Sequence, residues 1–382
     1  MSYDVIVVGA GSVGIPTALA LARAGVATLV LDALPSAGQG ANKAAIGGVR
    51  GTHSDPAKIH LCRRSLDILS SWQEVFGDDI EWQSGGYVFV AYREAEVRTL
   101  KSLIPVQQGY GLKIDWLEPL ELLDVVPDLV RSGLRGGTYS PGDGHCSTLL
   151  TSHAMYSRAV QAGAEFRFGE RVTAIEVESG RVQGVRTDRG RYASEVVVNA
   201  AGARARAVAQ LAGVDLPVTP DTHEAGITEP VARFLTPMVV DIRPAPDSAN
   251  YYFYQTRSGQ VIFCITPRPS IWGEDTRETS RFLPVVARRM VTLMPRLSSL
   301  RVRRTWRGLY PMTPDGLPIV GWAEEPNGFL QAAGMCGQGF MLGPGLGELL
   351  ARMVQRSLVR GDEETLRSLS PRRAFAAEEE LA

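Results

Sequence analysis

The chain has 382 residues, 45% of them hydrophobic, and a formal net charge of −1. This length predicts two domains, and the hydrophobic content is sufficient for full-sized cores. The near-zero charge and the lack of a strong basic run argue against nucleic acid as a partner. No run reaches the ~18 apolar residues that a membrane span needs, and the N-terminus shows no basic leader. We therefore expect a cytoplasmic protein with no membrane span.

The cysteines and histidines show no metal-binding spacing. The four cysteines are widely separated, and the five histidines form no cluster. Scattered thiols of this kind are typical of reduced, buried side chains in a cytosolic protein. We therefore expect no bound metal.

The N-terminal segment has a G-x-G-x-x-G pattern that follows an apolar, β-branched run and opens a helical pattern. In a dinucleotide-binding unit, Gly9 allows the tight turn, Gly11 lets the backbone approach a pyrophosphate and Gly14 lets helix and strand pack closely. The diphosphate then lies at the helix N-terminus, where N–H groups and the helix dipole favour an anion. Asp32, at 32 − 14 = 18 residues past the last glycine, ends the next strand and is placed to bind a ribose diol. A βα unit without a ligand is the alternative.

The patterns that follow alternate between helical and strand periodicity. They predict helices over residues 59–76, 94–108, 117–127, 148–162 and 282–294, and a last helix that runs to residue 350. They predict strands over residues 85–90, 165–168, 171–178, 181–187, 194–198, 238–242, 251–256, 260–265 and 329–333. Small residues after strand 194–198, Asn199-Ala200-Ala201-Gly202, indicate a second close approach of the backbone to the cofactor.

Two further motifs join these pieces: Thr313-Pro314-Asp315-Gly316-Leu317-Pro318-Ile319-Val320-Gly321, and Gly337-Gln338-Gly339-Phe340 between the last strand and the last helix. With the earlier motifs, they resemble the FAD-dependent amine and amino-acid oxidoreductases of the D-amino-acid oxidase superfamily. The similarity covers nearly the whole chain. The nearest branch contains glycine oxidase, sarcosine oxidase and the flavin β-subunits of proline, opine and sarcosine dehydrogenases. Residues 370–375 resemble the terminal Pro-x-Arg-Phe element of the family, with one residue inserted.

The resemblance implies an α/β fold in which a Rossmann-like FAD-binding domain is interleaved with an α+β, mixed-sheet substrate domain. The FAD-binding domain would comprise residues 1–85, 142–220 and 306–382, and the substrate domain would comprise residues 86–141 and 221–305. The isoalloxazine would lie between the domains, in agreement with the rule that ligands bind beyond the carboxyl ends of parallel strands.

The N-terminal pattern and the resemblance together predict the residues that bind the cofactor. The turn at Gly337 would aim a helix N-terminus at the flavin, where it stabilises the negative charge of the reduced ring; an ordinary packing turn is the alternative. No cysteine lies near Gly308, the region where monomeric sarcosine oxidases attach FAD, so we expect non-covalent FAD. The predicted cofactor-binding residues are Gly9, Gly11, Ser12, Val13, Gly14, Asp32, Ala33, Asn42, Lys43, Ala45, Ile46, Gly48, Val172, Ala201, Gly202, Gly308, Gly337, Gln338, Gly339, Phe340 and Met341.

Arg50 lies in a region where sarcosine-oxidase-like relatives carry an arginine that faces the substrate carboxylate. A guanidinium holds a carboxylate by two parallel hydrogen bonds. A surface arginine, or one that binds the FAD phosphates, is the alternative.

Three tyrosines and one methionine are candidates for the rest of the substrate pocket. For Tyr252 and Tyr254, core packing is the alternative. Tyr310 stands where glycine-oxidase-like enzymes have the carboxylate-binding arginine of a Gly-x-Arg-Pro sequence, which argues against a simple D-amino acid substrate. Met341 takes the place of a carboxylate-binding lysine in sarcosine oxidases.

The resemblance implies oxidation of a C–N bond by hydride transfer from the substrate to flavin N5, after which the imine hydrolyses in water. This mechanism needs no strong protein base, so no catalytic base is predicted. Residues 260–264 lack the lysine with which related oxidases activate oxygen, which favours a dehydrogenase over a fast oxidase. The expected substrate is a small amino acid or N-substituted amino acid of the sarcosine, proline, glycine or opine type.

Three other functions stay open at this point. The first is a flavin subunit of a hetero-oligomeric dehydrogenase, with electron-transfer subunits as partners and little activity alone. The second, an RNA-modifying flavoprotein, is disfavoured by the net charge. The third, a flavin hydroxylase, shares the N-terminal pattern but would oxidise NAD(P)H.

Overall fold

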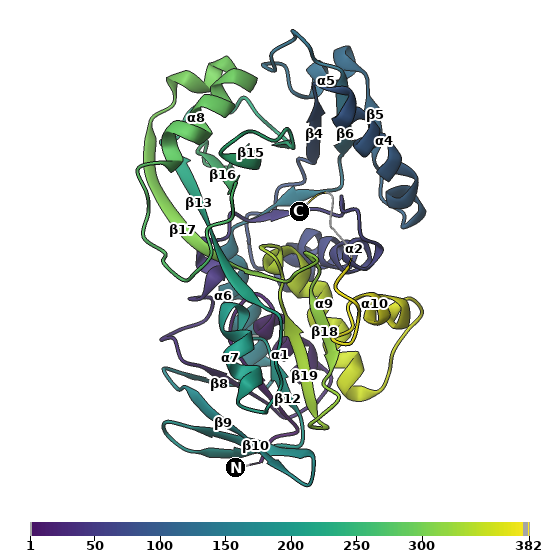
Figure 1. Cartoon of the computed structure of the whole chain (residues 1–382), viewed down its shortest axis with the longest axis vertical. Helices are drawn as coiled ribbons and strands as arrows, with labels where there is room; N and C mark the ends of the chain where they lie inside the picture. Colours follow the sequence, from purple (N-terminus) through teal and green to yellow (C-terminus); the bar gives the residue numbers. More distant parts are fainter. Residues whose placement is uncertain (1, 377–380, 382) are drawn as a thin grey trace.

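The computed structural model describes residues 2–376 and 381, and it has two large sheets toward opposite ends of its long axis (Figure 1). One is a six-stranded, mostly parallel sheet, and the other is an eight-stranded mixed sheet. The predicted α/β class is confirmed. In the part of the chain that the structure describes, no helix is long and apolar enough to cross a membrane.

The six-stranded sheet has the strand order β18-β19-β12-β1-β2-β8, and all neighbours are parallel except β18 and β19. The side chains of its first strand alternate between two cores: Val5 and Val7 pack into one core, and Ile6 and Val8 pack into the other. A strand that is apolar on both faces is typical of the centre of a parallel sheet. The strands are β1 (Val5–Val8), β2 (Thr28–Asp32), β8 (Glu165–Phe168), β12 (Val197–Asn199), β18 (Ile319–Trp322) and β19 (Phe329–Ala333).

Helices cover one face of this sheet, and a small sheet with one helix covers the other. The first face carries α1 (Gly14–Arg23), α2 (Pro56–Ser70), α3 (Trp72–Phe76), α6 (Thr148–Gln161) and α9 (Gly339–Gln355), with α10 (Asp362–Ser368) packed against α2. The second face carries α7 (Ala205–Gln210) and the three-stranded sheet of β9 (Val172–Glu178), β10 (Arg181–Thr187) and β11 (Arg191–Ala193).

The eight-stranded sheet has the order β17-β13-β16-β15-β14-β4-β6-β5, and only β14 and β4 are parallel neighbours. Its strands are β4 (Tyr87–Ala91), β5 (Asp115–Leu117), β6 (Gly136–Ser140), β13 (Thr219–Thr228), β14 (Met238–Asp241), β15 (Ser248–Gln255), β16 (Val261–Pro267) and β17 (Val302–Met312).

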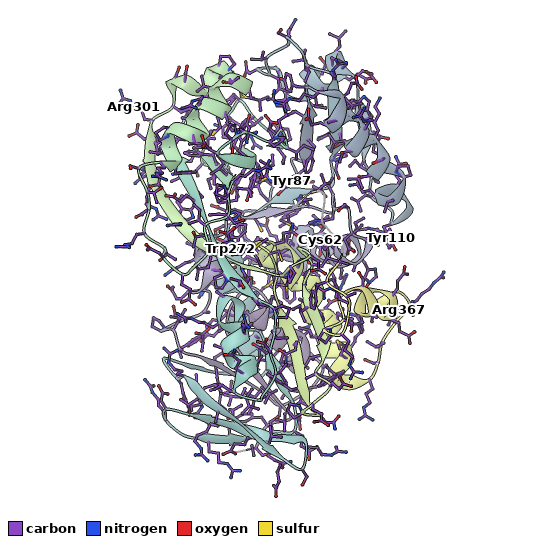
Figure 2. The ribbon with its side chains drawn as sticks, in the orientation of Figure 1. Cys62, Tyr87, Tyr110, Trp272, Arg301 and Arg367 are labelled. Atoms are coloured by element: carbon purple, nitrogen blue, oxygen red, sulfur yellow. The ribbon has the colours of Figure 1, made fainter. Side chains whose placement is uncertain are left out.

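The two faces of the eight-stranded sheet also have separate cores. Phe253 and its neighbours pack against α5 (Pro119–Val125), α8 (Phe282–Leu293) and the short helix η3 (Pro295–Ser299). Tyr87 lies on the opposite face, which α4 (Glu94–Gly109) partly covers. This opposite face is turned toward the six-stranded sheet: a Cβ on Gly48, in the ribbon of β3 (Gly48–Val49) and β7 (Gly144–His145), would lie 2.0 Å from Tyr87 Oη. Figure 2 shows Tyr87 at this junction.

The single helix predicted over residues 59–76 is wrong. Helix α2 begins earlier, at Pro56, because the Asp55 carboxylate accepts hydrogen bonds from the amides of Ala57 and Lys58 at 3.0 and 3.1 Å. An acidic N-cap followed by proline is a strong helix start. The helix ends at Ser70, and α3 follows as a separate helix.

Two long strands, β13 and β17, were not predicted. They pair antiparallel from Thr219 opposite Met312 to Thr228 opposite Val302. Strand β13 buries polar residues such as Thr222 and Glu224, so it lacks the apolar alternation of an ordinary strand. Both strands cross the predicted domain boundaries near residues 220 and 306, and the division into two domains stays a prediction.

Candidate functional site

Three glycines shape the turn between β1 and α1. A Cβ on Gly9, whose φ is +110°, would lie 2.4 Å from the carbonyl oxygen of Ala200, and one on Gly14 would lie 1.8 Å from that of Gly9. Neither position has room for a side chain. A Cβ on Gly11 would meet nothing within 4 Å in the described part of the chain, so Gly11 faces open space at the start of α1. A phosphate can reach the first-turn amides there, which have no intrahelical acceptor.

Helix α9 reaches α1 through a second set of glycines. A Cβ on Gly343 would lie 1.8 Å from the Ser12 carbonyl oxygen, and one on Gly347 would lie 2.6 Å from the Pro16 carbonyl carbon. Gly339 is one turn before Gly343, and its added Cβ would lie 3.2 Å from Ser12 Oγ. A spacing of four residues puts all three glycines on one face of α9. The helices therefore touch backbone to backbone, with their N-termini close together.

One pocket lies at these two helix starts. It is lined by Gly11, Ser12, Ile15, Pro16, Asn42, Thr151, Ser152, Met155, Phe340 and Pro344. Asn42 Nδ2 donates to Ser152 Oγ at 2.6 Å, which fixes the amide. Asn42 Oδ1, and Gln338 Oε1 at the start of α9, are buried and have no hydrogen-bond partner among the described residues. Buried polar atoms normally have partners, so these two oxygens fit a ligand that brings donors.

Asp32 ends β2 beside the glycine turn. Its carboxylate accepts the Ala10 amide at 2.7 Å and the Leu34 amide at 2.8 Å. Burial raises the pKa of this carboxyl above its usual value, and the two amides oppose that effect. The Glu170 amide donates to the Asp32 carbonyl at 3.0 Å, so the start of β9, with the predicted residue Val172, lies beside the end of β2.

The predicted FAD loop at residues 42–48 is held by the eight-stranded sheet. Trp306 Nε1 donates to the Ala44 carbonyl at 2.8 Å, and a Cβ on Gly308 would lie 2.7 Å from Ala44 Cβ. Tyr254 Oη donates to the Ile46 carbonyl. Two predicted cofactor contacts of this loop, Lys43 and Ala45, are exposed or partly buried, and so are three predicted contacts outside the loop: Ala33, Ala201 and Gly202.

Arg50 is buried, with 7% of its surface exposed, which excludes the surface alternative. Its Nη1 donates to the Thr52 carbonyl and its Nη2 to the Leu381 carbonyl. The guanidinium carbon lies 5.5 Å from the centre of the Phe89 ring, on the face of the eight-stranded sheet that is turned toward the six-stranded sheet. A fixed, desolvated cation between the two sheets can bind an anionic group of a ligand.

Asp143 supports the loop after Arg50, and the sequence did not single it out. Its carboxylate accepts the Gly51 amide at 2.8 Å and the Thr52 hydroxyl at 2.6 Å. Burial raises the pKa of Asp143 to about 6, while these hydrogen bonds and the nearby charge of Arg50 act in the opposite direction. In the sequence, this residue stands in a Pro-Gly-Asp-Gly run that is typical of a turn.

Tyr252 and Tyr310 lie side by side, and their part in substrate binding stays a prediction. Their hydroxyl oxygens lie 3.1 Å apart. The Tyr310 ring stacks on His223 at a centroid distance of 3.7 Å. It also covers the turn before α9, because a Cβ on Gly337 would lie 2.1 Å from Tyr310 Cε2. This pair therefore lies between the eight-stranded sheet and the predicted flavin turn.

The other two predicted pocket residues have different surroundings. Tyr254 stacks against His145 at a centroid distance of 4.1 Å, and its hydroxyl is used by the Ile46 carbonyl. The Met341 side chain packs against the core of the six-stranded sheet. Their part in substrate binding stays a prediction.

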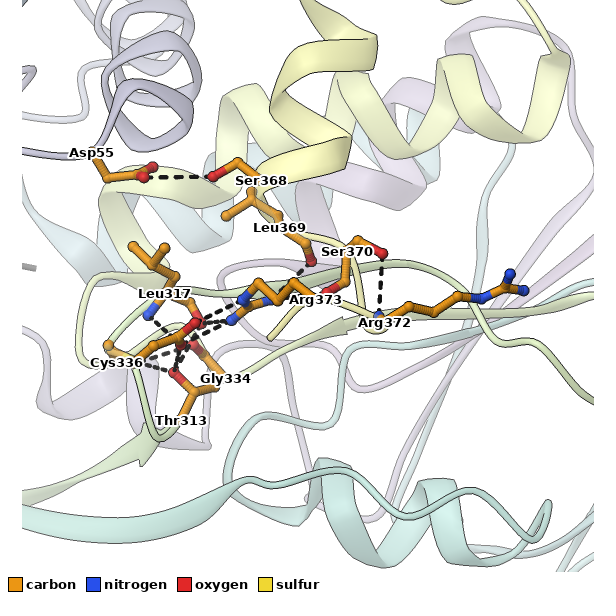
Figure 3. A network of polar contacts seen from close by, with 12 residues as sticks. Asp55, Thr313, Leu317, Gly334, Cys336, Ser368, Leu369, Ser370, Arg372 and Arg373 are labelled. Carbon is orange, nitrogen blue, oxygen red and sulfur yellow. Dashed lines mark hydrogen bonds and ion pairs between the residues drawn. The ribbon is translucent and has the colours of Figure 1, made fainter. Parts of the chain in front are cut away.

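The element resembling a family terminus forms a buried ion pair. Arg373 donates to the Asp315 carboxylate at 2.7 and 2.9 Å and to the Leu317 carbonyl at 2.8 Å (Figure 3). Burial acts against the charged form of Asp315, but the hydrogen bonds from Arg373 keep its pKa below the usual value. The segment after α10 is thereby fixed to the loop of the Thr313 motif.

Comparison with known proteins gives a family match and several similar chains. The family model described as "DAO: FAD dependent oxidoreductase" matches residues 4–353. Glycine oxidase of Geobacillus kaustophilus (strain HTA426) is 29% identical over 378 residues, which cover 97% of this chain and 96% of that protein. Sarcosine oxidase subunit beta of Arthrobacter sp is 24% identical and covers 92% of this chain and 87% of its own length. The crystal structure of L-proline dehydrogenase from P. horikoshii superposes with a TM-score of 0.90, at 29% identity and 97% coverage of each chain.

Proposed function

Because the chain belongs to the DAO family of FAD-dependent oxidoreductases, we propose that it is a dehydrogenase for the C–N bond of a small amino acid or N-substituted amino acid. The observation that carries this proposal is the buried guanidinium of Arg50, between the two large sheets and beside the tyrosine-bearing face. When bound, FAD supplies the acceptor for the hydride that leaves the substrate carbon.

The residues of the pocket fit FAD. The open space at Gly11 and the two helix N-termini suit the diphosphate, and Asp32 at the end of β2 suits the ribose. Cys336 precedes the predicted flavin turn, but its sulfur lies 3.3 Å from Thr313 Oγ1 and 3.1 Å from the Gly334 carbonyl oxygen. Its position agrees with non-covalent binding.

Arg50 would bind the substrate carboxylate, and the tyrosine pair would line the space around the reacting carbon. Burial raises the pKa of the Tyr252 and Tyr310 hydroxyls, and it raises that of the Cys264 thiol to about 11. All three groups are therefore neutral at pH 7. A neutral surface suits a neutral amine, and residues 260–264 lack the lysine with which related oxidases activate oxygen, which supports a dehydrogenase.

A flavin subunit of a larger assembly is the second candidate. It is favoured by one observation, that a relative aligned over 92% of this chain is named a subunit. Activity of the purified chain with an artificial acceptor separates the candidates, because a dependent subunit would show little.

The proposal is tested by anaerobic titration of the FAD-loaded protein with sarcosine, L-proline, glycine and opines. We expect at least one of them to bleach the flavin absorbance, and air to restore it slowly compared with an artificial acceptor. Flavin that dithionite reduces but none of these compounds reduces would contradict the proposal. Rapid release of hydrogen peroxide would show that the protein is an oxidase and would contradict its proposed role as a dehydrogenase.

A further inference from the structure

His223 and Asp221 form a buried pair on β13. Their surfaces are 6% and 3% exposed. Gly308 of β17 lies opposite His223, and a Cβ on Gly308 would lie 2.7 Å from Ala44 Cβ. Residues that pair directly across neighbouring strands share a face, and so do residues two apart on one strand. His223 therefore lies on the same face as Tyr310, which is the face that the predicted FAD loop covers.

The hydrogen bonds of Asp221 determine which nitrogen of His223 carries the hydrogen. Asp221 Oδ1 accepts the amides of Thr222 and Ile271, each at 2.7 Å, and Oδ2 lies 3.3 Å from His223 Nε2. Burial acts against the charged form of Asp221, but the hydrogen bonds from His223 and the two amides keep its pKa below the usual value. An ionised carboxylate can only accept hydrogen bonds. We therefore assign the hydrogen to Nε2, and Nδ1 of the neutral ring carries a lone pair.

Nδ1 is the atom of this pair that the protein does not use. It is buried and has no hydrogen-bond partner among the described residues. Buried polar atoms normally have partners, so this acceptor fits a ligand that brings a donor. Burial lowers the pKa of His223, the hydrogen bond to Asp221 opposes that effect, and the charge of Arg307 on β17 adds to it. The ring is therefore neutral at pH 7, and Nδ1 can accept a proton.

The surroundings of the ring would stabilise it once it is protonated. Asp221 faces the Nε2 hydrogen, and the Tyr310 ring stacks on the imidazole at a centroid distance of 3.7 Å. A cation at this distance from an aromatic face is attracted to it. Among the titratable groups on neighbouring elements, burial keeps Tyr252, Tyr310 and Cys264 neutral at pH 7, and Lys43 is exposed. The added charge is thus balanced within the pair.

We propose that His223 takes a proton from the ammonium group of the substrate, and that Asp221 is the positioning residue that sets its tautomer. An aliphatic ammonium loses its proton only at about pH 10, as a lysine does. Until it does so, its nitrogen has no lone pair for the C=N bond. The N–H bond breaks and an Nδ1–H bond forms, and the lone pair left on nitrogen forms the C=N bond as the hydride leaves the carbon. The proton on Nδ1 then passes to water. This inference rests on the proposed function, because it concerns the amine end of the same substrate.

The test measures binding without turnover. 2-Aminoisobutyrate has an ammonium and a carboxylate but no hydrogen on its α-carbon, so it cannot be oxidised there. We expect calorimetry with the FAD-loaded protein to give an affinity that hardly changes between pH 7 and 9. The His223→Asn site should take only the neutral amine, about one molecule in 1000 at pH 7, so its affinity should be about 1000-fold lower there and rise about tenfold per pH unit. 2-Hydroxyisobutyrate, which has no amine, should bind both proteins alike.

Asp221→Asn tests the tautomer with the imidazole in place. The new side-chain oxygen can still accept the amides of Thr222 and Ile271, but its NH2 group donates to Nε2. Nδ1 then carries the hydrogen and cannot accept a proton. We expect the same pH-dependent loss of affinity as in His223→Asn. The control is His60→Asn in α2, whose Nε2 also faces a carboxylate, 3.9 Å from Asp362 Oδ1. It should keep the wild-type pH profile.

Several results would overturn the inference. One is a wild-type affinity that rises about tenfold per pH unit, and another is no binding of 2-aminoisobutyrate at any pH. A loss in His223→Asn that is equal at every pH would assign the ring to packing alone. An Asp221→Asn protein with the wild-type profile would remove the role of the tautomer. The wild-type profile needs no variant, so the inference stays testable if a substitution prevents folding.

These outcomes are separate from those of the proposed function, which flavin reduction decides. A protein that shows these pH profiles with 2-aminoisobutyrate, but whose flavin no amine reduces, fails only as an amine dehydrogenase. A protein whose flavin sarcosine or L-proline reduces, but whose His223→Asn variant shows no pH-dependent loss, lacks only the proton acceptor.

Discussion

The predicted cofactor region and the proposed substrate region are built by different means. In the turn before α1 and at the crossing of α1 and α9, glycines bring backbone against backbone: an added Cβ on Gly14 would lie 1.8 Å from the Gly9 carbonyl oxygen, and one on Gly343 would lie 1.8 Å from that of Ser12. Around Arg50, side chains from distant segments meet, such as Asp143, which binds the amide of Gly51. The first region depends on the absence of side chains, and the second on their pairing. Substitutions in the first region should therefore disrupt the structure and FAD binding, whereas substitutions in the second should change substrate binding and rate.

The largest effect is expected from Gly343→Ala. The new methyl group would collide with the Ser12 carbonyl oxygen, so α9 must move away from α1. We expect the free energy of unfolding to fall by about 3 kcal/mol and FAD to be lost on gel filtration. Gly109→Ala is the matched control, because this helical position has nothing within 4 Å of the added Cβ among the described residues. An FAD-retaining Gly343→Ala protein of normal stability would contradict the backbone contact.

Arg50→Met should act on substrate and spare the cofactor. Loss of a charge-assisted pair of hydrogen bonds is worth about 3 kcal/mol, so KM for a carboxylate substrate should rise about 100-fold. The FAD content should stay normal. The exposed Arg301→Met variant is the control and should behave as wild type. Loss of FAD with an unchanged KM would instead assign Arg50 to the FAD phosphates.

The pKa of Asp143 predicts a pH dependence of stability. Its value rises from 3.8 in the unfolded chain to about 6 in the folded protein, so the folded state binds the proton more tightly between these values. The stability of wild type relative to Asp143→Asn should therefore fall as pH rises from 4 to 6, by up to about 1.4 kcal/mol per pH unit, and then level off. Urea titrations of both proteins at each pH measure it. A difference that is flat across this window would show that burial does not control this carboxyl.

The smallest effect is expected from Tyr310→Phe, which removes one hydroxyl of the pair at 3.1 Å. A neutral hydrogen bond is worth about 1 kcal/mol, so kcat/KM should fall about fivefold. Tyr251→Phe makes the same chemical change on the outer face, where the hydroxyl donates to the Arg289 carbonyl at 3.1 Å. That control should lose stability but no activity. Equal kinetic losses in both variants would assign the Tyr310 effect to general destabilisation.

The same contrast explains what the sequence could reveal. The roles of Gly9, Gly11 and Gly14 were predicted because each depends only on the local backbone geometry of one βα unit. Asp143 was not, since an acid between glycines is typical of a turn and its partner Thr52 lies 91 residues away. No local sequence pattern predicts that Leu381 packs in the cluster with Tyr87 and Phe89. Strand β13 was not predicted because its buried polar residues interrupt the alternation of apolar and polar residues that indicates a strand.

Tyr310 touches both regions, through Tyr252 on one side and the backbone of Gly337 on the other. If the proposed site is right, substitutions in β4 and β15 at positions that do not contact the predicted flavin turn would change specificity with little effect on that turn. A smaller residue at position 310 would enlarge the pocket and also leave the turn before α9 unsupported. Any descendant that changes this position would therefore also have to restore the support of the turn before α9.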